Sequence, residues 1–217
     1  MTMIDDLIEG YRRYRAGWTE AERELYRQLV EHGQSPKVMV IACCDSRVDP
    51  SIILDAKPGS LFMVRNVANL VPPFERDGAY HGTSAALEFA VRRLNVDHII
   101  VMGHAHCGGI RALYEENQES SASDFILGWM RIVAEAGRHV HANCRDMTPP
   151  QQHRALEQEA IRVSIRNLLT FPWIESQVSA GKLHLHGWYY ALAEGILMAL
   201  DPRSNEFRSL LDGNVKK

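Results

Sequence analysis

One short segment limits the folds open to this chain more than any other. Residues 97–103 (Asp-His-Ile-Ile-Val-Met-Gly) form a β-rich run with no polar residue at its centre. Strands of this kind belong to parallel sheets whose two faces are both covered. Similar runs occur at 37–42, 61–64 and 183–186, and segments with helical periodicity lie between them at 85–94, 125–141 and 155–169. This alternation predicts an α/β fold, a sheet flanked by helices. Residues 143–152, which include Pro149 and Pro150, are predicted to be a surface loop.

The two ends of the chain are organised differently from this core. Residues 1–33 show two helical patterns rich in charged side chains, and a sequence with glycine and proline then breaks the helix. Near the other end, residues 188–190 and 196–200 flank a turn and predict an edge hairpin. We expect a single domain over residues 1–217, in which an N-terminal helical arm (1–33) precedes an α/β core (34–217).

The composition excludes several classes of protein. The chain has 217 residues, of which 46% are hydrophobic and 24% charged, and its formal net charge is −3. This balance fits neither a disordered chain nor broad electrostatic binding to nucleic acid or an anionic membrane. The longest apolar run, residues 38–44, is too short to cross a bilayer. Acidic residues near the N-terminus do not fit a secretory signal, so we expect a cytoplasmic protein whose four cysteines are metal ligands, catalytic groups or buried thiols.

Two clusters of reactive side chains follow predicted strands. Residues 43–47 (Cys-Cys-Asp-Ser-Arg) come after the first strand, and residues 104–109 (His-Ala-His-Cys-Gly-Gly) come after the third. Ligands and catalytic groups in open α/β sheets gather at the carboxyl ends of the strands. In extended backbone Cys43, Asp45 and Arg47 point to the same side. The sequence therefore predicts a thiolate, a carboxylate and a guanidinium close together.

Together, the two clusters offer the ligands of a zinc site. Cys43, His104 and Cys107 supply two thiolates and one imidazole, a set that suits zinc. Asp45 is the candidate for a fourth protein ligand, but Arg47 competes for that carboxylate through a bidentate pair. If that pair forms, the fourth position is left for water, as in catalytic zinc sites. Taken alone, the His-x-x-Cys spacing also fits core or surface residues with no metal.

Other cysteine and histidine residues leave alternatives open. Cys44 and Cys144 fit buried thiols better than metal ligands. His184 and His186 alternate with leucines on a predicted strand, so they could form a second metal site, or a hydrogen-bonded or exposed pair. No Gly-x-Gly-x-x-Gly follows a predicted strand, which counts against a zinc-dependent dehydrogenase with the same ligands.

These motifs resemble those of a known family, the β-class carbonic anhydrases. The two matching signatures are Cys43-x-Asp45-Ser46-Arg47 and His104-x-x-Cys107-Gly108-Gly109. Flanking segments are similar too, among them Gln34-Ser35-Pro36-Lys37, Arg65-Asn66-Val67-Ala68-Asn69, Val71-Pro72-Pro73-Phe74 and His186-Gly187-Trp188-Tyr189-Tyr190. The resemblance runs from about residue 35 to residue 190, which is most of the chain.

The resemblance implies an enzyme and a mechanism. Cys43, His104 and Cys107 would hold one zinc ion per subunit, and the reaction would be the reversible hydration of carbon dioxide to bicarbonate and a proton. A hydroxide on the zinc, oriented by the Asp45–Arg47 pair, would attack the substrate. The resemblance also implies a mostly parallel central β-sheet, and a homodimer or dimer-based higher oligomer in which the helical arm packs on the partner subunit.

The same resemblance distinguishes two forms of the site. In the open form Asp45 bonds to Arg47, whereas in the closed form Asp45 is itself a metal ligand. Members with a regulatory bicarbonate site have tryptophan at the position of Val40, although Arg65 and Tyr190 match the rest of that site. The flanking segments are instead similar to plant-type, open members. We therefore expect an open site without a bicarbonate switch.

The resemblance further implies a substrate pocket with an apolar wall. Its lining residues would be Gln34, Phe62, Val67 and Phe89, together with the backbone amide of Gly108. Phe89 stands where plant-type members commonly have tyrosine, so that wall lacks one hydroxyl.

Two alternative functions remain open at this point. Some relatives with the same ligands hydrolyse carbonyl sulfide or carbon disulfide. A non-catalytic protein could also bind zinc or bicarbonate on this fold, although the presence of both Asp45 and Arg47 argues against that alternative.

Overall fold

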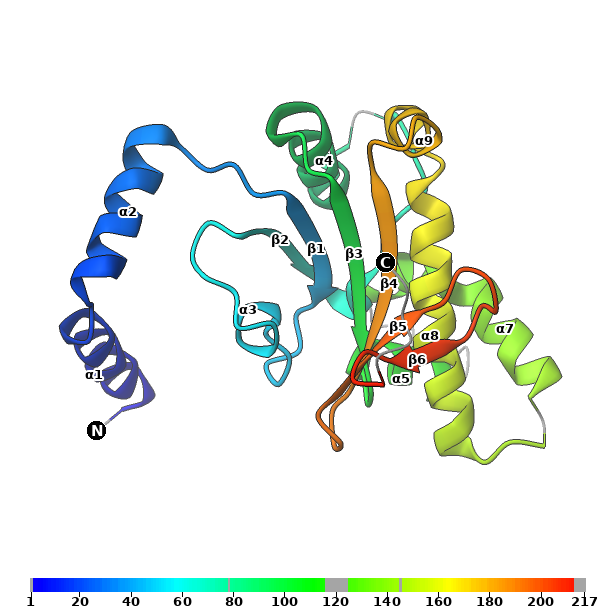
Figure 1. The fold of residues 1–217 in the computed structure, drawn as a ribbon. Helices are drawn as coiled ribbons and strands as arrows, with labels where there is room; N and C mark the ends of the chain where they lie inside the picture. The colour runs from blue at the N-terminus through cyan, green and yellow to red at the C-terminus, as the bar shows by residue number, and fades with distance from the viewer. Residues whose placement is uncertain (1, 78, 116–124, 145, 213–217) are drawn as a thin grey trace. The chain divides into compact units, whose positions relative to one another are not determined.

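The computed structural model describes residues 2–77, 79–115, 125–144 and 146–212, and Figure 1 shows the path of the chain. The chain divides into two compact units, Met1–Ser35 and Pro36–Lys217. The arm predicted at 1–33 lies within the first unit, and the single domain predicted over residues 1–217 stays a prediction.

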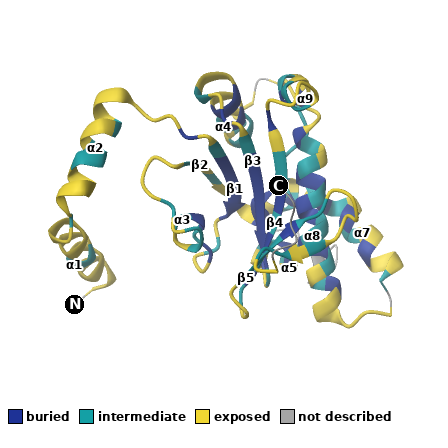
Figure 2. Cartoon of the chain, in the orientation of Figure 1, coloured by how far each residue is buried: buried dark blue, intermediate teal, exposed yellow. Residues whose placement is uncertain are grey.

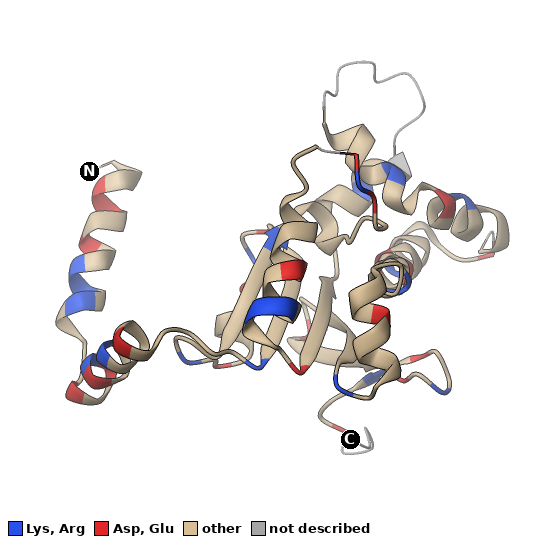
Figure 3. Ribbon diagram, turned by 90° about the horizontal axis from the view of Figure 1, so that it is seen from above, with Lys and Arg blue, Asp and Glu red and all other residues tan. Residues whose placement is uncertain are grey.

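The first unit contains two helices, as the periodicity of the arm predicts. They are α1 (Met3–Ala16) and α2 (Glu20–His32). Each begins with a capping box, formed by Thr2 with Asp5 and by Thr19 with Glu22, which satisfies two backbone N–H groups at the helix start. In α1, acidic side chains lie in the first turn and basic ones in the last, which suits the helix dipole (Figure 3). No described residue of either helix is buried.

Within the described residues, the second unit is built on a six-stranded sheet with the order β2-β1-β3-β4-β5-β6. The strands are β1 (Val38–Cys43), β2 (Leu61–Asn66), β3 (His98–His104), β4 (His184–Ala191), β5 (Ile196–Leu200) and β6 (Phe207–Ser209). The first four strands in this order pair in parallel, and β5 and β6 extend the sheet antiparallel. The predicted mostly parallel sheet is confirmed. β1 and β3 are buried over almost their whole length, as their apolar runs predict.

The C-terminal strands differ in part from the prediction. The strand predicted at 183–186 and the segment 188–190 belong to one continuous strand, β4. β4 and β5 do form the predicted hairpin, but β6 pairs with β5, so the hairpin does not lie at the edge of the sheet. β6 has only three residues, too few to show a strand periodicity in the sequence.

The helices of the second unit include one that contradicts a predicted loop. They are α3 (Pro50–Ile53), α4 (Gly82–Phe89), α5 (Gly108–Glu115), α6 (Ile126–Met130), α7 (Ala134–Asn143), α8 (Pro149–Leu168) and α9 (Pro172–Ser179), with short helical turns η1 (Val67–Asn69), η2 (Ala90–Leu94) and η3 (Arg131–Val133). The loop predicted at 143–152 is wrong in its second half. Pro149 and Pro150 start α8, where proline costs no helical hydrogen bond, and Thr148 forms a capping box with Gln151. None of the helices in the described part of the chain has the length and apolar character needed to span a bilayer.

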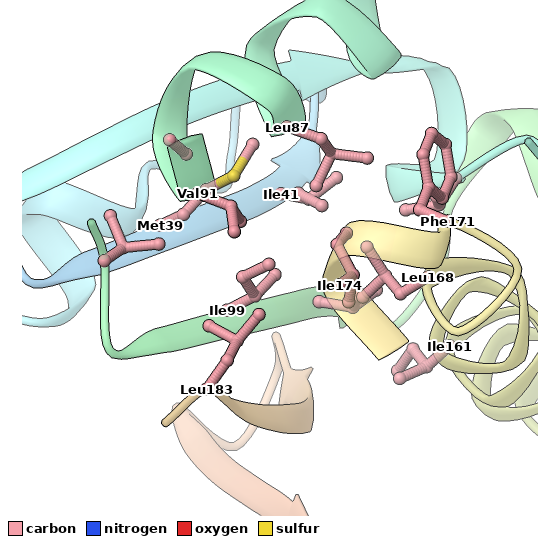
Figure 4. Close-up of a cluster of buried hydrophobic side chains, with 14 of the residues drawn as sticks. Met39, Ile41, Leu87, Val91, Ile99, Ile161, Leu168, Phe171, Ile174 and Leu183 are labelled. Atoms are coloured by element: carbon pink, nitrogen blue, oxygen red, sulfur yellow. The ribbon is translucent and has the colours of Figure 1, made fainter. Parts of the chain in front are cut away.

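Apolar side chains pack on both faces of the sheet. Figure 2 shows the central strands β1 and β3 in the colour of buried residues. On one face, β1 and β3 pack against α4, α8 and α9, and Figure 4 shows Met39, Ile41, Leu87, Ile99, Ile161, Phe171 and Ile174 in this cluster. On the other face, the buried residues are Val40, Ala42, Val48, Ile100 and Met102. A third cluster surrounds Cys43 and Cys107 with apolar side chains from α5, α6, α7 and α8. Cys43 and Cys107 are therefore held in place by a packed apolar cluster.

Helix α8 approaches the sheet closely at two glycines. A Cβ atom at Gly103 would lie 2.8 Å from Cδ1 of Ile161, and one at Gly187 would lie 2.9 Å from its Cγ2. Ile161 is fully buried, so its side chain has no space to move into. We expect Gly103→Ala to lower the free energy of unfolding by about 1–3 kcal/mol through overpacking. Gly128→Ala, whose Cβ would meet no atom within 4 Å, is the control. Equal losses for both variants in denaturant titrations would contradict this packing.

Candidate metal centre

The two reactive clusters meet at the carboxyl end of the sheet. Cys43 is the last residue of β1, His104 is the last residue of β3, and Cys107 lies directly before α5. Because β1 and β3 are parallel neighbours, their carboxyl ends lie side by side. In the turn that follows β3, His106 adopts the left-handed conformation, with φ of 57°. This turn directs the chain from β3 into α5.

Cys43, His104 and Cys107 form a compact buried group. Their ligand atoms all lie within 4.8 Å of one another, and the two Sγ atoms are 3.9 Å apart. Among the described residues, this is the one group of three or more Cys, His, Asp or Glu residues gathered so closely. The structure thus brings together the three side chains that the sequence predicts as metal ligands. Cys44 and Cys144 lie outside the group. Cys44 is exposed and not buried as predicted, because it follows the last residue of β1.

The imidazole of His104 is oriented as a metal ligand would be. Its Nδ1 lies 2.8 Å from the carbonyl oxygen of Ala105, to which it donates as N–H. This tautomer leaves a lone pair on Nε2, which is buried without a hydrogen-bond partner among the described residues. A metal-bound histidine commonly donates its other ring N–H to a carbonyl in this way. An unpartnered nitrogen beside two sulfur atoms fits zinc, which binds imidazole and thiolate together.

The contact between the two thiols shifts their pKa values in opposite directions. The hydrogen bond with Cys107 lowers the pKa of Cys43 to about 4. The same bond, together with burial, raises the pKa of Cys107. One thiolate is therefore present at neutral pH even before a metal binds. A divalent cation would complement this charge and release the second proton, because thiols bind metals in the deprotonated form.

Asp45 is fixed at the edge of the group by Arg47. The guanidinium donates from Nε to Oδ1 at 2.9 Å and from Nη2 to Oδ2 at 2.7 Å, and the Arg47 backbone N–H donates to Oδ1 at 2.9 Å. These bonds from Arg47 hold the pKa of Asp45 well below its usual range. Oδ2 of Asp45 lies 3.9 Å from Nε2 of His104. Arg47 also donates to the carbonyl oxygen of His106 at 2.9 Å, which joins the two loops of the site.

Arg65 of β2 supports the backbone of the first loop. Its guanidinium donates to the carbonyl oxygens of Cys43 at 2.9 Å, Asp45 at 2.7 Å and Val48 at 2.8 Å. Sequence analysis connected Arg65 only with a bicarbonate site. This positioning role depends on the pairing of β2 with β1, which motif spacing does not show.

Glu157 of α8 is a buried residue of the site that sequence analysis did not identify. Its Oε1 accepts the backbone N–H of Cys107 at 3.0 Å, and its Oε2 accepts the hydroxyl of Tyr189 at 2.8 Å. Burial and the nearby Glu157 carboxylate raise the pKa of that tyrosine. The sequence does indicate that Glu157 is buried, since this residue lies four positions before Ile161 on the apolar face of a predicted helix. A charge in such a position requires partners.

Removal of the Glu157 carboxylate should destabilise the protein. Glu157→Leu leaves the backbone N–H of Cys107 and the hydroxyl of Tyr189 without their acceptor. Each buried group that loses its partner costs about 1–3 kcal/mol, so we expect the free energy of unfolding to fall by about 2 kcal/mol or more. Glu157→Gln keeps an oxygen for the N–H and should lose clearly less. The measurement is urea unfolding, and equal losses in the two variants would contradict the bonding role.

Two of the predicted pocket residues lie at the metal end of the sheet. Val67 follows Asn66, which is paired in register with Cys43. The carbonyl oxygen of Val67 accepts the indole N–H of Trp129 at 2.7 Å, and both residues line an apolar cleft of about 910 Å³. Gly108 is the first residue of α5, directly after Cys107.

Phe62 and Phe89, two further predicted pocket residues, are not brought to the group within the second unit. Phe62 is paired with Met39, four register positions before Cys43, which is about 13 Å along the strand. Its ring stacks on that of Phe89 with centroids 5.7 Å apart. Gln34 belongs to the first unit. The rings of Phe62 and Phe89 thus form an apolar pair, but this pair lies away from Cys43 of the same chain.

Comparison with known proteins agrees with the geometry of the site. A family model described as carbonic anhydrase matches residues 38–197. Beta carbonic anhydrase 3 of Arabidopsis thaliana is 37% identical over 194 residues, which cover 88% of this chain and 74% of that protein. The chain belongs to the β-class carbonic anhydrases. The predicted family is therefore confirmed.

Further relatives of this β-carbonic anhydrase are similar over comparable lengths. The carbonic anhydrase of Synechocystis sp. is 36% identical over 201 residues, or 93% of this chain and 72% of that protein. Among solved structures, the β-carbonic anhydrase CcaA superimposes with a TM-score of 0.89 at 35% identity and covers 96% of this chain and 100% of that one. The similarity includes the N-terminal helices as well as the sheet.

Proposed function

We propose that this β-carbonic anhydrase catalyses the reversible hydration of carbon dioxide to bicarbonate and a proton, with one zinc ion per subunit held by Cys43, His104 and Cys107. Bound zinc supplies a Lewis acid that lowers the pKa of water. The observation that carries the proposal is the Asp45–Arg47 pair beside a group that has three candidate ligands among the residues the structure describes. A structural zinc site has four protein ligands, whereas a catalytic site keeps one position open.

The residues around the group have separate roles in this reaction. Asp45, held ionised by Arg47, accepts a hydrogen bond from the attacking oxygen and aims its lone pair at the substrate carbon. Arg47 keeps the carboxylate from turning toward the metal. The backbone N–H of Gly108 at the start of α5 donates to a substrate oxygen, because a helix N-terminus favours developing negative charge. Val67 supplies part of the apolar wall.

We further propose that the functional form is a homodimer, or an oligomer built from dimers. α1 exposes an apolar series that includes Met3, Ile4, Leu7, Ile8 and Tyr11. A soluble surface seldom leaves such a series uncovered, and a second copy of the chain would cover it. The position of Phe62 and Phe89 agrees, because these two rings lie away from the chain's own cysteines and would line the pocket of a partner subunit instead. Sedimentation velocity should give at least twice the 24.6 kDa mass of one chain. A monomer at micromolar concentration would contradict this.

Two further proposals concern the state of the site and its compartment. The Asp45–Arg47 pair supports the open form, in which Asp45 is not a metal ligand, and Val40 in place of tryptophan supports the absence of a bicarbonate switch. Two thiolate ligands must stay reduced to bind zinc, which fits a reducing compartment such as the cytoplasm.

Stopped-flow hydration of carbon dioxide by the zinc-loaded protein, followed across pH, tests this function. We expect fast turnover that changes smoothly through one apparent pKa. A steep collapse toward lower pH would contradict the open form and leave the enzyme assignment standing. The absence of turnover with one zinc per chain would contradict the assigned reaction and favour hydrolysis of a sulfur analogue, or a binding role.

A further inference from the structure

Three histidines gather at the end of the sheet opposite to the cysteines. His98 is the first residue of β3 and His184 the first residue of β4, and the two are paired in the parallel register. His186 lies two residues further along β4. Because side chains alternate along a strand, His184 and His186 point to the same face of the sheet. His104 lies six residues beyond His98, about 20 Å along β3, so this group is separate from the metal centre.

The imidazole ring of His98 contacts those of both His186 and His184. Nδ1 of His98 lies 3.1 Å from Nε2 of His186. The ring of His98 also stacks on that of His184, with centroids 5.3 Å apart and planes inclined by 30°. His98 and His186 are half-buried, whereas His184 is exposed. The ring of His98 therefore lies between two others, one half-buried and one exposed.

This spacing suits a metal ion shared between the rings. Two nitrogens bound to one tetrahedral ion at 2.0–2.1 Å lie about 3.3 Å apart, close to the separation of the His98 and His186 nitrogens. Imidazole is a preferred ligand of zinc, nickel and copper ions. Burial and the two neighbouring imidazoles lower the pKa of His186, so its ring is in the neutral form that binds metals. The nitrogens of the three rings do not all lie within 4.8 Å of one another, so the exposed His184 side chain has to turn before one of its nitrogens can reach the same ion.

We propose that His98, His184 and His186 form a second transition-metal site. Its ligand is a divalent ion of the class that prefers imidazole, with Ni²⁺ and Zn²⁺ as examples. His98 and His186 form the preorganised pair, and His184 closes on the bound ion from the surface. The remaining coordination positions are open to solvent. Because the site lies about 20 Å along β3 from His104, it has no part in carbon dioxide hydration. The proposal is independent of the activity assigned above.

The experiment is calorimetric titration of Ni²⁺ into the full chain already loaded with one zinc. The wild type should bind one Ni²⁺ per chain while its zinc stays in place, as measured by elemental analysis after gel filtration. His184→Ala with His186→Ala should lose this binding and retain the zinc. The chain offers a matched control in His139 and His141 of α7, which have the same spacing on a helix, where residues two apart do not share a face. His139→Ala with His141→Ala should bind Ni²⁺ as the wild type does.

Several results would overturn the proposal. One is a wild type that binds no Ni²⁺, which would leave the contact as a hydrogen bond between neutral rings. Another is binding that persists in the strand variant, or that the helix control also loses. If the strand variant fails to fold, His98→Gln replaces the central ring by a side chain of similar length. Retained Ni²⁺ binding in that folded variant would equally contradict the site.

Discussion

The Cys43→Ser variant should fold, yet hold no zinc and hydrate carbon dioxide no faster than the uncatalysed reaction. Cys43 is one of the three proposed ligands, and the hydrogen bond with Cys107 lowers its pKa to about 4. A serine hydroxyl stays protonated near neutral pH and offers no soft thiolate to the metal. Serine is close in size to cysteine, so the apolar cluster around the site keeps its packing. Elemental analysis and stopped-flow assays measure the two effects.

The chain contains a matched control for this variant in the next residue. Cys44 is exposed and lies outside the group of ligand atoms. Cys44→Ser makes the same chemical change one position away, and should keep one zinc per chain and wild-type turnover. Zinc retained in the Cys43 variant, or lost equally from both, would show that the ligands are assigned wrongly.

The parts of the fold that follow from the sequence are those set by local pattern. The central strands β1 and β3 were predictable because each is an apolar run buried on both faces. The position of Cys43 and His104 followed from the rule that the carboxyl ends of parallel strands meet. The start of α8 was missed because Pro149 and Pro150 read as a break, although proline is favourable in a first helical turn.

The parts of the site that did not follow from the sequence depend on contacts between distant segments. Glu157 reaches the backbone of Cys107 only because α8 packs on β3 and β4 near Gly103 and Gly187. His98 contacts His186 because β3 and β4 pair in one register, which spacing within either strand cannot reveal. Motif analysis finds residues close in sequence or at known strand ends, whereas these positioning contacts arise from tertiary packing.

The Asp45→Asn variant should retain its zinc and lose about 10²–10⁴-fold in turnover, the usual contribution of a positioned acid or base group. Both carboxylate oxygens accept hydrogen bonds from Arg47, at 2.9 and 2.7 Å. An asparagine amide replaces one acceptor by an N–H₂ donor, which either faces the guanidinium or turns toward the group of ligands. In both orientations the site loses the charged acceptor that would align the attacking oxygen. Zinc content should remain at one ion per chain, because the three proposed ligands are untouched.

The pH dependence of turnover distinguishes the loss of this orienting carboxylate from general damage to the site. Arg47 holds the pKa of Asp45 well below its usual range, so Asp45 stays ionised between about pH 6 and 9 and contributes no titration there. The variant should therefore be slower at every pH in this range, and not only at one end. Asp201→Asn is the control: Asp201 lies directly after β5 and accepts the Arg203 N–H at 2.8 Å, a role that asparagine also fills. Wild-type turnover in the Asp45 variant, or a matching loss in the Asp201 variant, would show that the Asp45 carboxylate does not orient the reaction.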